Sequence, residues 1–282
     1  ADIPEGWKAG IFFKNDGDTW LHRSKALRPQ SQAYINFLEA GGAIEDAPEM
    51  RLVLQEINDA CLQLNNEVKE KTTELLKQGK LIGLVGGDHS TPLGYLEALA
   101  EKHPEFSVLQ IDAHLDLREA YEGFTYSHAS IFFNALKIPQ INKLVQAGIR
   151  DYCDTEAAMV ASNPERIRVF YDREIKESGF RGRTYHDLCM EIVQALGEKV
   201  YVSFDIDGLQ PFYCPNTGTP VPGGFQFEEA VYLIKLLVES GRKIIGFDLN
   251  EVGGAGNDWD GNVGARMLYQ LCIWAARSQN LV

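Results

Sequence analysis

The stretch Gln110-Ile-Asp-Ala-His-Leu-Asp-Leu-Arg118 decides the fold class and indicates the kind of site. It continues an apolar run, residues 106–111, which is typical of a strand buried on both faces of a sheet. Side chains two apart in an extended chain point the same way, so Asp112, His114 and Asp116 form one row. Two carboxylates and an imidazole in a row predict a metal site at the carboxyl end of this strand, where parallel sheets bind ligands.

Strand-like and helical patterns alternate along most of the chain, which predicts a mostly parallel sheet covered by helices on both faces, an α/β/α architecture of three layers. The predicted strands are 80–85, 106–111, 143–149, 166–171, 199–204 and 243–247, and the predicted helices are 47–79, 91–99, 131–136, 156–161, 185–196, 228–240 and 263–278. Residues 1–47 show only aromatic clusters, such as 11–13, and turn formers at 15–18.

Length and composition favour one domain over residues 1–282, with 1–79 as an N-terminal segment ending in a long helix and 80–282 as the core that carries the metal site. No apolar run approaches the roughly 20 residues of a spanning helix, and residues 1–10 lack the features of a signal peptide. We therefore expect a soluble, cytoplasmic protein. The formal charge of −13 disfavours nucleic acid as a partner and mildly favours cationic ligands.

Three other predicted strands also end in polar residues suited to metal binding. His89 lies in the loop Gly86-Gly-Asp-His-Ser90, Asp205 and Asp207 follow the strand at 199–204, and Glu251 lies shortly after the last strand. Each residue has a simpler reading, since a single histidine after two glycines is commonly a loop residue and a single aspartate commonly caps a helix. Together these residues favour metal binding over the simpler readings, because four unpaired aspartates at neighbouring strand ends would repel one another and raise each other's pKa.

Charge counting predicts how many ions this cluster needs. Four aspartates contribute −4 and two divalent cations contribute +4, while the two imidazoles are neutral. Six candidate ligands suffice for two metals: His89, Asp112, His114, Asp116, Asp205 and Asp207. Oxygen-rich ligation without thiolate favours Mn²⁺ over Zn²⁺, although ligand type alone leaves Zn²⁺, Ni²⁺, Co²⁺ and Fe²⁺ open.

The motifs at 86–90, 112–116 and 203–208, with Thr217-Gly-Thr-Pro220, resemble the arginase/agmatinase ureohydrolases from about Leu81 onward, and an agmatinase-like member in particular. The resemblance implies an α/β/α domain with a sheet of about eight parallel strands. It also implies a dimanganese centre that hydrolyses a guanidino group to an amine and urea, and a homo-oligomer, trimeric or hexameric. By the same resemblance, one metal is held by His89, Asp112, Asp116 and Asp205, and the other by Asp112, His114, Asp205 and Asp207.

The resemblance also assigns catalytic residues, namely His128, Glu251 and Asp116. His128 matches a histidine that passes a proton to the leaving amine, and Glu251 matches a glutamate that pairs with the substrate guanidinium. The simpler readings are a histidine at a helix start and a glutamate on a surface loop. Asp88 is expected to support the ligands, and residues 217–224 to shape the pocket.

Departures from the family pattern bear on the substrate. Gln210-Pro211 replaces the usual Asp-Pro, and Leu117-Arg118 and Cys153 stand where arginases grip an α-amino acid. Tyr126-Ser-His128 is similar to agmatinases, whereas Asp116-Leu-Arg118 is similar to formimidoylglutamases. If Arg118 points inward, its guanidinium favours an acidic substrate.

The leading prediction is therefore hydrolysis of agmatine to putrescine, a step of polyamine metabolism. It holds if Arg118 turns away into an ion pair with a neighbour such as Glu119 or Glu122. An arginase, a formimidoylglutamase or a guanidino-acid hydrolase are the alternatives within the family. A deacetylase-like or non-catalytic binding protein is the alternative from a different class. Two metals per chain argue against the deacetylase reading.

Overall fold

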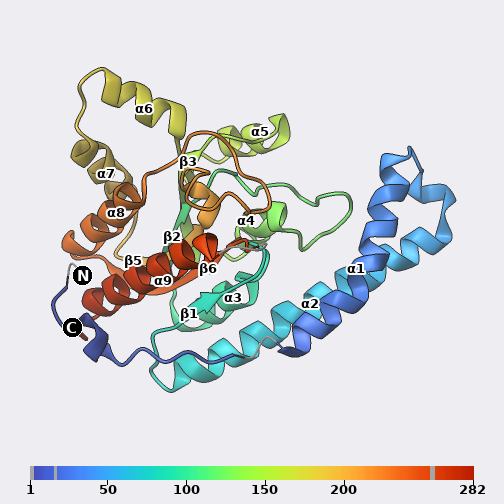
Figure 1. Cartoon of the computed structure of the whole chain (residues 1–282), viewed down its shortest axis with the longest axis horizontal. Helices are drawn as coiled ribbons and strands as arrows, with labels where there is room; N and C mark the ends of the chain where they lie inside the picture. The colour runs from blue at the N-terminus through green and yellow to red at the C-terminus, as the bar shows by residue number, and fades with distance from the viewer. Residues whose placement is uncertain (1–2, 16–17, 255–257) are drawn as a thin grey trace.

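The computed structural model describes residues 3–15, 18–254 and 258–282, and in this part of the chain a parallel sheet lies between two layers of helices (Figure 1). The strands are β1 (Gly83–Val85), β2 (Phe106–Ile111), β3 (Ile141–Ile149), β4 (Ile167–Tyr171), β5 (Lys199–Asp205) and β6 (Lys243–Asn250). The helices are α1 (Asp18–Glu39), α2 (Pro48–Lys77), α3 (Leu93–Lys102), α4 (Ile131–Ala135), α5 (Asp154–Ser162), α6 (Asp172–Phe180), α7 (Tyr185–Gln194), α8 (Phe227–Glu239) and α9 (Trp259–Ser278).

All strand pairs are parallel, and the strand order is β1-β6-β5-β2-β3-β4. The predicted three-layer α/β/α architecture is therefore confirmed. The expected count of about eight strands is not met by the described residues, whose sheet has six. The sheet ends at β1 because the described chain before it forms the helices α1 and α2 instead of further strands.

Two apolar clusters bury the two faces of the sheet. One cluster joins the sheet to α6, α7, α8 and α9, and the other joins it to α2, α3, α4 and α5. The strand β2 is buried along its whole length, as its continuous apolar run predicts. Burial on both sides leaves the carboxyl ends of the strands as the place where polar side chains can gather.

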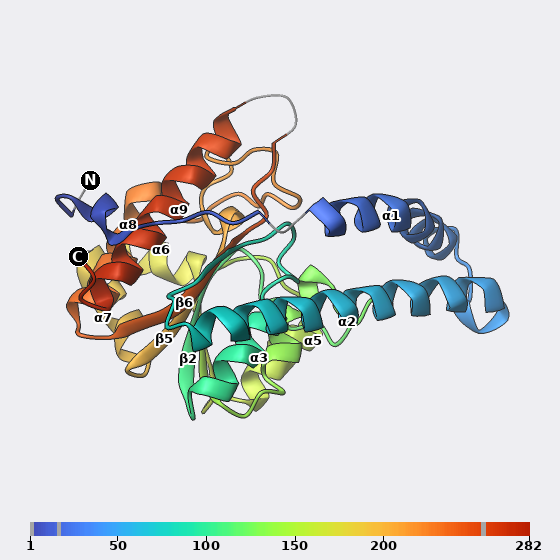
Figure 2. The same ribbon diagram turned by 90° about the horizontal axis from the view of Figure 1, so that it is seen from below.

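The helices α1 and α2 form an N-terminal pair that reaches beyond the sheet (Figure 2). The C-terminal half of α2 packs beside α3, and α1 folds back along α2, where Trp20 Nε1 donates to Glu67 Oε2 at 2.8 Å and Arg23 to Gln63 Oε1 at 2.5 Å. The helix α1 was not predicted, and the predicted turn at 15–18 includes residues 16 and 17, which lie outside the described residues. No helix in the described part of the chain is long and apolar enough to cross a bilayer.

Candidate metal centre and active site

The strand order brings the predicted site residues together. The strands β1, β6, β5 and β2 are neighbours in that order, and all run the same way. His89 follows β1, Asp112 follows β2, Asp205 ends β5 and Glu251 follows β6. In the register of β2 and β5, Ile111 pairs with Phe204, so Asp112 lies beside Asp205 at the same edge.

His89 lies at the centre of the first group of candidate ligands. Its side chain is 1% exposed, and Nδ1 lies 3.0 Å from Asp112 Oδ2, 3.1 Å from Asp116 Oδ2 and 3.3 Å from Asp205 Oδ2. Even so, this buried Nδ1 has no hydrogen-bond partner. Ligand atoms about 2.1 Å from one octahedral divalent ion lie about 3.0 Å apart. The spacing around His89 Nδ1 therefore fits ligands that face a common cation.

A second group shares a residue with the first. His114 Nδ1 lies 3.1 Å from Asp207 Oδ2 and 3.5 Å from Asp112 Oδ1. In each group the ligand atoms lie within 4.8 Å of one another. The first group is His89, Asp112 and Asp205, and the second is Asp112, His114 and Asp207. The two oxygens of Asp112 thus face different imidazoles, which is the arrangement that a carboxylate bridging two ions requires.

The raised pKa values of the clustered carboxylates also indicate that the cluster binds cations. Burial, followed by the charges of Asp207 and Asp112, raises the pKa of Asp205 well above its usual value. Burial and the charge of Asp112 raise the pKa of Asp116 to about 7, and the same two causes raise the pKa of Asp207. Burial also opposes ionisation of Asp112, but the neighbouring imidazoles of His114 and His89 hold its pKa below the usual range. Carboxylates packed in this way are stabilised as anions by divalent ions.

The orientation of His89 is fixed by residues to which the sequence assigned no role. Its Nε2 lies 2.8 Å from Ser203 Oγ, which donates to Asp248 Oδ1 at 3.0 Å. Asn250 Nδ2 donates to the same oxygen at 2.6 Å. With its hydroxyl proton on Asp248, Ser203 accepts the Nε2 proton and leaves the Nδ1 lone pair for a metal. The signal was available, since Ser203 lies two residues before Asp205 and so shares its side of β5.

Asp112 is also held by partners that the sequence did not reveal. Gln110 Nε2 donates to Asp112 Oδ2 at 2.8 Å, and the His114 backbone N–H donates to Asp112 Oδ1 at 2.7 Å. Asp116 has a left-handed backbone with φ of 54°, and its carbonyl accepts the N–H of Phe132 at 3.0 Å. Backbone strain of this kind is common in active sites, where neighbouring contacts maintain it.

Glu251 also has a left-handed backbone, with φ of 62°, and its Oε1 accepts the backbone N–H of His89 at 2.9 Å. Burial, followed by the charge of Asp88, raises the pKa of Glu251 to about 7. The predicted pocket segment lies beside it, because Thr217 Oγ1 donates to the Glu251 carbonyl at 2.8 Å and a Cβ on Gly218 would lie 3.6 Å from Glu251 Oε2. Glu251 therefore joins the pocket segment to the candidate metal ligands.

His128 begins the short 3₁₀ turn His128–Ser130, for which Ser127 is the N-cap. Burial is the main cause that lowers the pKa of His128. The next largest effects are the charge of Asp88, which raises this pKa, and the charge of His114, which lowers it, so the imidazole lies near the carboxylate cluster. The Tyr121 ring lies 5.9 Å from its imidazole ring, centroid to centroid. A neutral, half-buried imidazole beside the ligands is suited to accept and donate protons near neutral pH.

Arg118 forms an ion pair, although its partner is not one of the two neighbours named as examples from the sequence. Its Nε lies 3.7 Å from Glu156 Oε2, whereas Glu119 and Glu122 had been expected. The carboxylate of Glu156 is 4% exposed and also accepts the backbone N–H groups of Leu117 and Cys153. A buried glutamate on α5 is the stronger partner, since its position is fixed by these backbone groups. The sequence could not show this contact, because Glu156 is remote along the chain.

Comparison with known proteins agrees with this geometry. Residues 21–273 match the arginase family, which extends the resemblance further toward the N-terminus than the motifs indicated. The N(1)-aminopropylagmatine ureohydrolase of Thermus thermophilus is 33% identical over 202 residues, covering 72% of this chain and 65% of the relative. The guanidinobutyrase of Pseudomonas aeruginosa is 30% identical over 262 residues, covering 88% of this chain and 79% of the relative.

A solved structure is similar as well. The proclavaminate amidinohydrolase of Streptomyces clavuligerus superimposes with a TM-score of 0.65 at 28% identity, covering 76% of this chain and 70% of that chain. The present chain thus spans about two thirds of the length of such relatives. The family uses a binuclear metal centre, which agrees with two ligand groups that share Asp112. The chain belongs to the arginase family.

Proposed function

We propose that this chain is a ureohydrolase that cleaves a guanidino group into an amine and urea at a centre of two Mn²⁺ ions. The observation that carries the proposal is the buried, unpartnered His89 Nδ1 among three carboxylates, next to a second imidazole–carboxylate group through Asp112. A second, deacetylase-like function is not favoured, because two ligand groups point to two ions. The number of bound ions per chain separates the two functions.

The donor set fits two divalent ions. We assign His89, Asp112, Asp116 and Asp205 to one ion and Asp112, His114, Asp205 and Asp207 to the other, with Asp112 and Asp205 shared. Two bound divalent ions would supply a nucleophile from water at neutral pH. Mn²⁺ is the preferred ion because carboxylate oxygen dominates the set and thiolate is absent from it.

Glu251 and His128 have separate tasks in this proposal. The carboxylate of Glu251 pairs with the planar guanidinium and holds its central carbon beside the ligands. Hydrolysis of this carbon breaks the bond to the substituted nitrogen, and that nitrogen must gain a proton to leave as an amine. His128 passes the proton, and its lowered pKa suits an imidazole that cycles between neutral and charged forms. Water supplies the oxygen of urea.

Agmatine is the substrate that we favour, with putrescine as the amine. Arg118 is engaged by Glu156, so its positive charge is partly balanced and opposes a cationic substrate less. The chain is acidic, with a formal charge of −13, and one relative is named for aminopropylagmatine. The relative named guanidinobutyrase keeps a guanidino acid as the alternative, since the Arg118 side chain is still 38% exposed.

Urea release is the direct test of this proposal. The Mn²⁺-loaded wild type and Arg118→Ala are compared on agmatine, arginine, 4-guanidinobutyrate and formimidoylglutamate, with ammonia or formamide as the readout for the last. We expect the highest kcat/KM for agmatine, with little loss in Arg118→Ala. Faster turnover of the acids, lost in Arg118→Ala, would reverse the choice of substrate. No turnover of any compound would contradict the function itself. A trimeric or hexameric assembly stays a prediction that light scattering can check.

A further inference from the structure

A tight turn lies between Arg118 and His128 and carries an aromatic side chain toward both. Tyr121 and Phe124 exchange two backbone hydrogen bonds of 3.2 and 2.8 Å across the turn. Its two central residues, Glu122 and Gly123, have φ of 52° and 85°, as in a two-residue β-hairpin. The Tyr121 ring centroid lies 5.1 Å from the Arg118 guanidinium carbon and 5.9 Å from the His128 ring centroid. The turn therefore borders the candidate active site.

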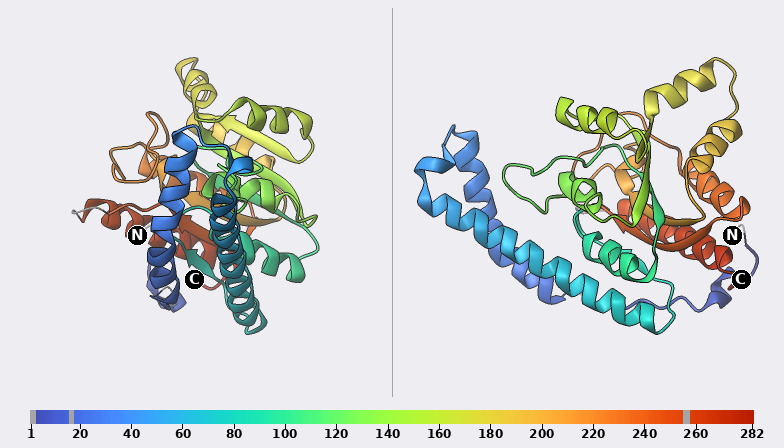
Figure 3. Two further views of the ribbon diagram at one scale, coloured as in Figure 1. Left: turned by 90° about the vertical axis from the view of Figure 1, so that its right-hand side faces the viewer. Right: turned by 180° about the vertical axis from the view of Figure 1, so that it is seen from behind.

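The N-terminal helix pair holds this turn from outside. Asn58 on α2 uses both ends of its amide, because Nδ2 donates to the Gly123 carbonyl at 3.1 Å and Oδ1 accepts the Thr125 N–H at 2.9 Å. Tyr34 on α1 is 2% exposed and donates to the Glu122 carbonyl at 2.9 Å. Figure 3 (right) shows the loop before α4 reaching out from the sheet toward α1 and α2.

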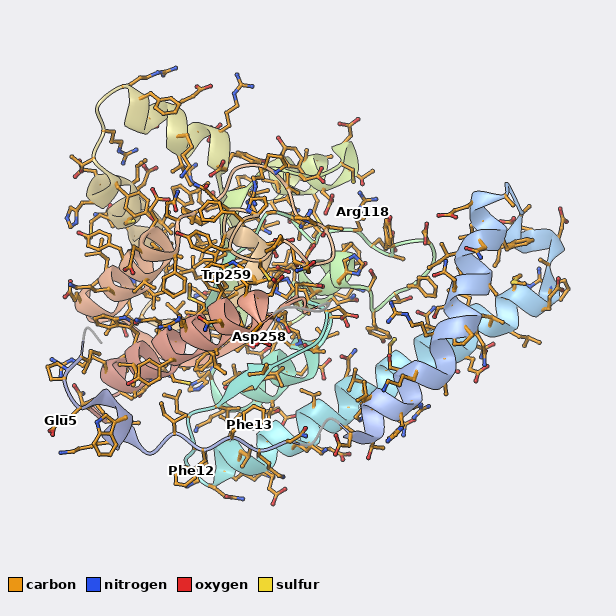
Figure 4. The ribbon with its side chains drawn as sticks, viewed as in Figure 1. Glu5, Phe12, Phe13, Arg118, Asp258 and Trp259 are labelled. Carbon is orange, nitrogen blue, oxygen red and sulfur yellow. The ribbon has the colours of Figure 1, made fainter. Side chains whose placement is uncertain are left out.

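The contact is also closely packed. The Tyr34 and Phe124 rings meet edge to face with centroids 5.2 Å apart. A Cβ on Gly123 would lie 2.9 Å from Leu54 Cδ2 and 3.0 Å from Tyr34 Oη. An added methyl group there would require Leu54 or Tyr34 to shift, so the turn packs closely against the helix pair. Arg118, labelled in Figure 4, lies on the same loop.

We propose that Asn58, with Tyr34, is a positioning residue for the active site, acting through the turn on His128. This inference rests on the proposed function, in which His128 passes a proton. Thr125 is held on both sides, since its N–H donates to Asn58 and its carbonyl accepts Asn134 Nδ2 at 2.8 Å. Only two residues separate Thr125 from His128, so a displacement at Thr125 reaches the imidazole.

The path from the turn to His128 has a further link. The backbone N–H of Arg118 donates to the Ala129 carbonyl at 3.0 Å, and the Ala129 N–H donates to Ser127 Oγ at 3.3 Å. Release of the turn thus loosens both ends of the loop at the residues beside His128. Asp116, the candidate ligand nearest to Arg118, is held by the backbone N–H groups of Phe132 and Phe133 at 3.0 and 3.3 Å, and the other candidate ligands lie at or near strand ends. We therefore expect metal binding to persist when Asn58 is changed.

The test uses Asn58→Ala and Tyr34→Phe, with Asn66→Ala as the matched control on the exposed side of α2. In Asn58→Ala we expect kcat for agmatine to fall by about 10- to 100-fold with Mn²⁺ content unchanged. Asn58→Asp keeps an acceptor for the Thr125 N–H and should restore part of kcat. Tyr34→Phe keeps the ring contact with Phe124 and should lose less than Asn58→Ala. The control should keep the wild-type kcat.

Amide hydrogen exchange supplies a readout that needs no activity. Asn58→Ala should speed exchange at Thr125 and at Ala129, whereas Asn66→Ala should change neither. Wild-type kcat in Asn58→Ala, or faster exchange at Thr125 without any change at Ala129, would overturn the positioning role. If the wild type hydrolyses no guanidino compound, the proposed function fails by itself. Exchange at Ala129 then still decides whether Asn58 holds the segment around His128.

Discussion

Ser203→Ala should weaken metal binding although Ser203 is not a candidate ligand. The change removes the hydroxyl that lies 2.8 Å from His89 Nε2 and donates to Asp248 Oδ1 at 3.0 Å. His89 Nε2 is then buried without an acceptor, and the imidazole can take the tautomer with the proton on Nδ1. That tautomer has no lone pair to offer at the metal-facing nitrogen.

The size of the effect follows from these two losses. Removal of a partner that orients a ligating histidine typically costs 10- to 100-fold in metal affinity, or about 1.4–2.7 kcal/mol. A buried donor left unsatisfied costs about 1–3 kcal/mol in the metal-free protein as well. Asp248 Oδ1 still accepts the hydrogen bond from Asn250 Nδ2 at 2.6 Å, so removal of the Ser203 hydroxyl costs less at Asp248 than at His89. We expect weaker Mn²⁺ binding together with a lower melting temperature.

Calorimetric titration of the stripped protein with Mn²⁺ measures the affinity, and Ser107→Ala is the matched control. Ser107 is fully buried near the other end of the sheet, and its Oγ accepts the Gly197 N–H at 2.9 Å. Its removal should lower the melting temperature without changing Mn²⁺ affinity. Equal affinity in Ser203→Ala and wild type, or equal loss in the two variants, would refute the role of the His89–Ser203–Asp248 chain.

Three further predictions concern the metal site and its neighbours. Chelation should lower the melting temperature, since metal at 100 times its Kd stabilises the fold by about 2.7 kcal/mol, and identical melting of loaded and stripped protein would count against the clustered carboxylates. Asp207→Asn should lose metal, whereas His128→Asn should keep the metal content and lose about 10²–10⁴-fold in kcat, and elemental analysis beside urea release distinguishes them. Because burial and Asp88 raise the pKa of Glu251 to about 7, its carboxylate is protonated as pH falls below that value. KM for agmatine should therefore rise at lower pH in wild type and stay constant with pH in Glu251→Gln. Parallel pH profiles of KM in the two proteins would exclude Glu251 from substrate binding.

Local pattern predicted the part of the site that lies on single strands. The strand at 106–111 was predicted with the bounds that β2 has, because a continuous apolar run is buried on both sides. Asp112, His114 and Asp116 do follow the end of β2, and the pair Asp205 and Asp207 lies at the end of β5. The spacing of two led to these positions, but the extended chain assumed for 112–116 was wrong, because β2 ends at Ile111 and Asp116 has a left-handed backbone with φ of 54°.

Features that depend on distant contacts were not predicted. The helix α1 has few buried side chains and contains Pro29, so its sequence gave little helical pattern. The strongly polar α6 was missed for a similar reason. Glu156 was not foreseen as the partner of Arg118, because it becomes a neighbour only through folding. Nothing in the sequence indicated a role for Asn58, since the two backbone groups that it binds, the Gly123 carbonyl and the Thr125 N–H, lie in a loop more than 60 residues away.

The number of Mn²⁺ ions bound per chain at saturation tests the proposed centre most directly. The stripped protein is titrated with Mn²⁺ and analysed by elemental mass spectrometry after removal of unbound metal. Two ligand groups that share Asp112 predict two ions per wild-type chain. We expect both to be lost or weakened in Asp112→Asn. A wild-type chain that binds one ion, or none, would contradict a binuclear centre built on this shared carboxylate.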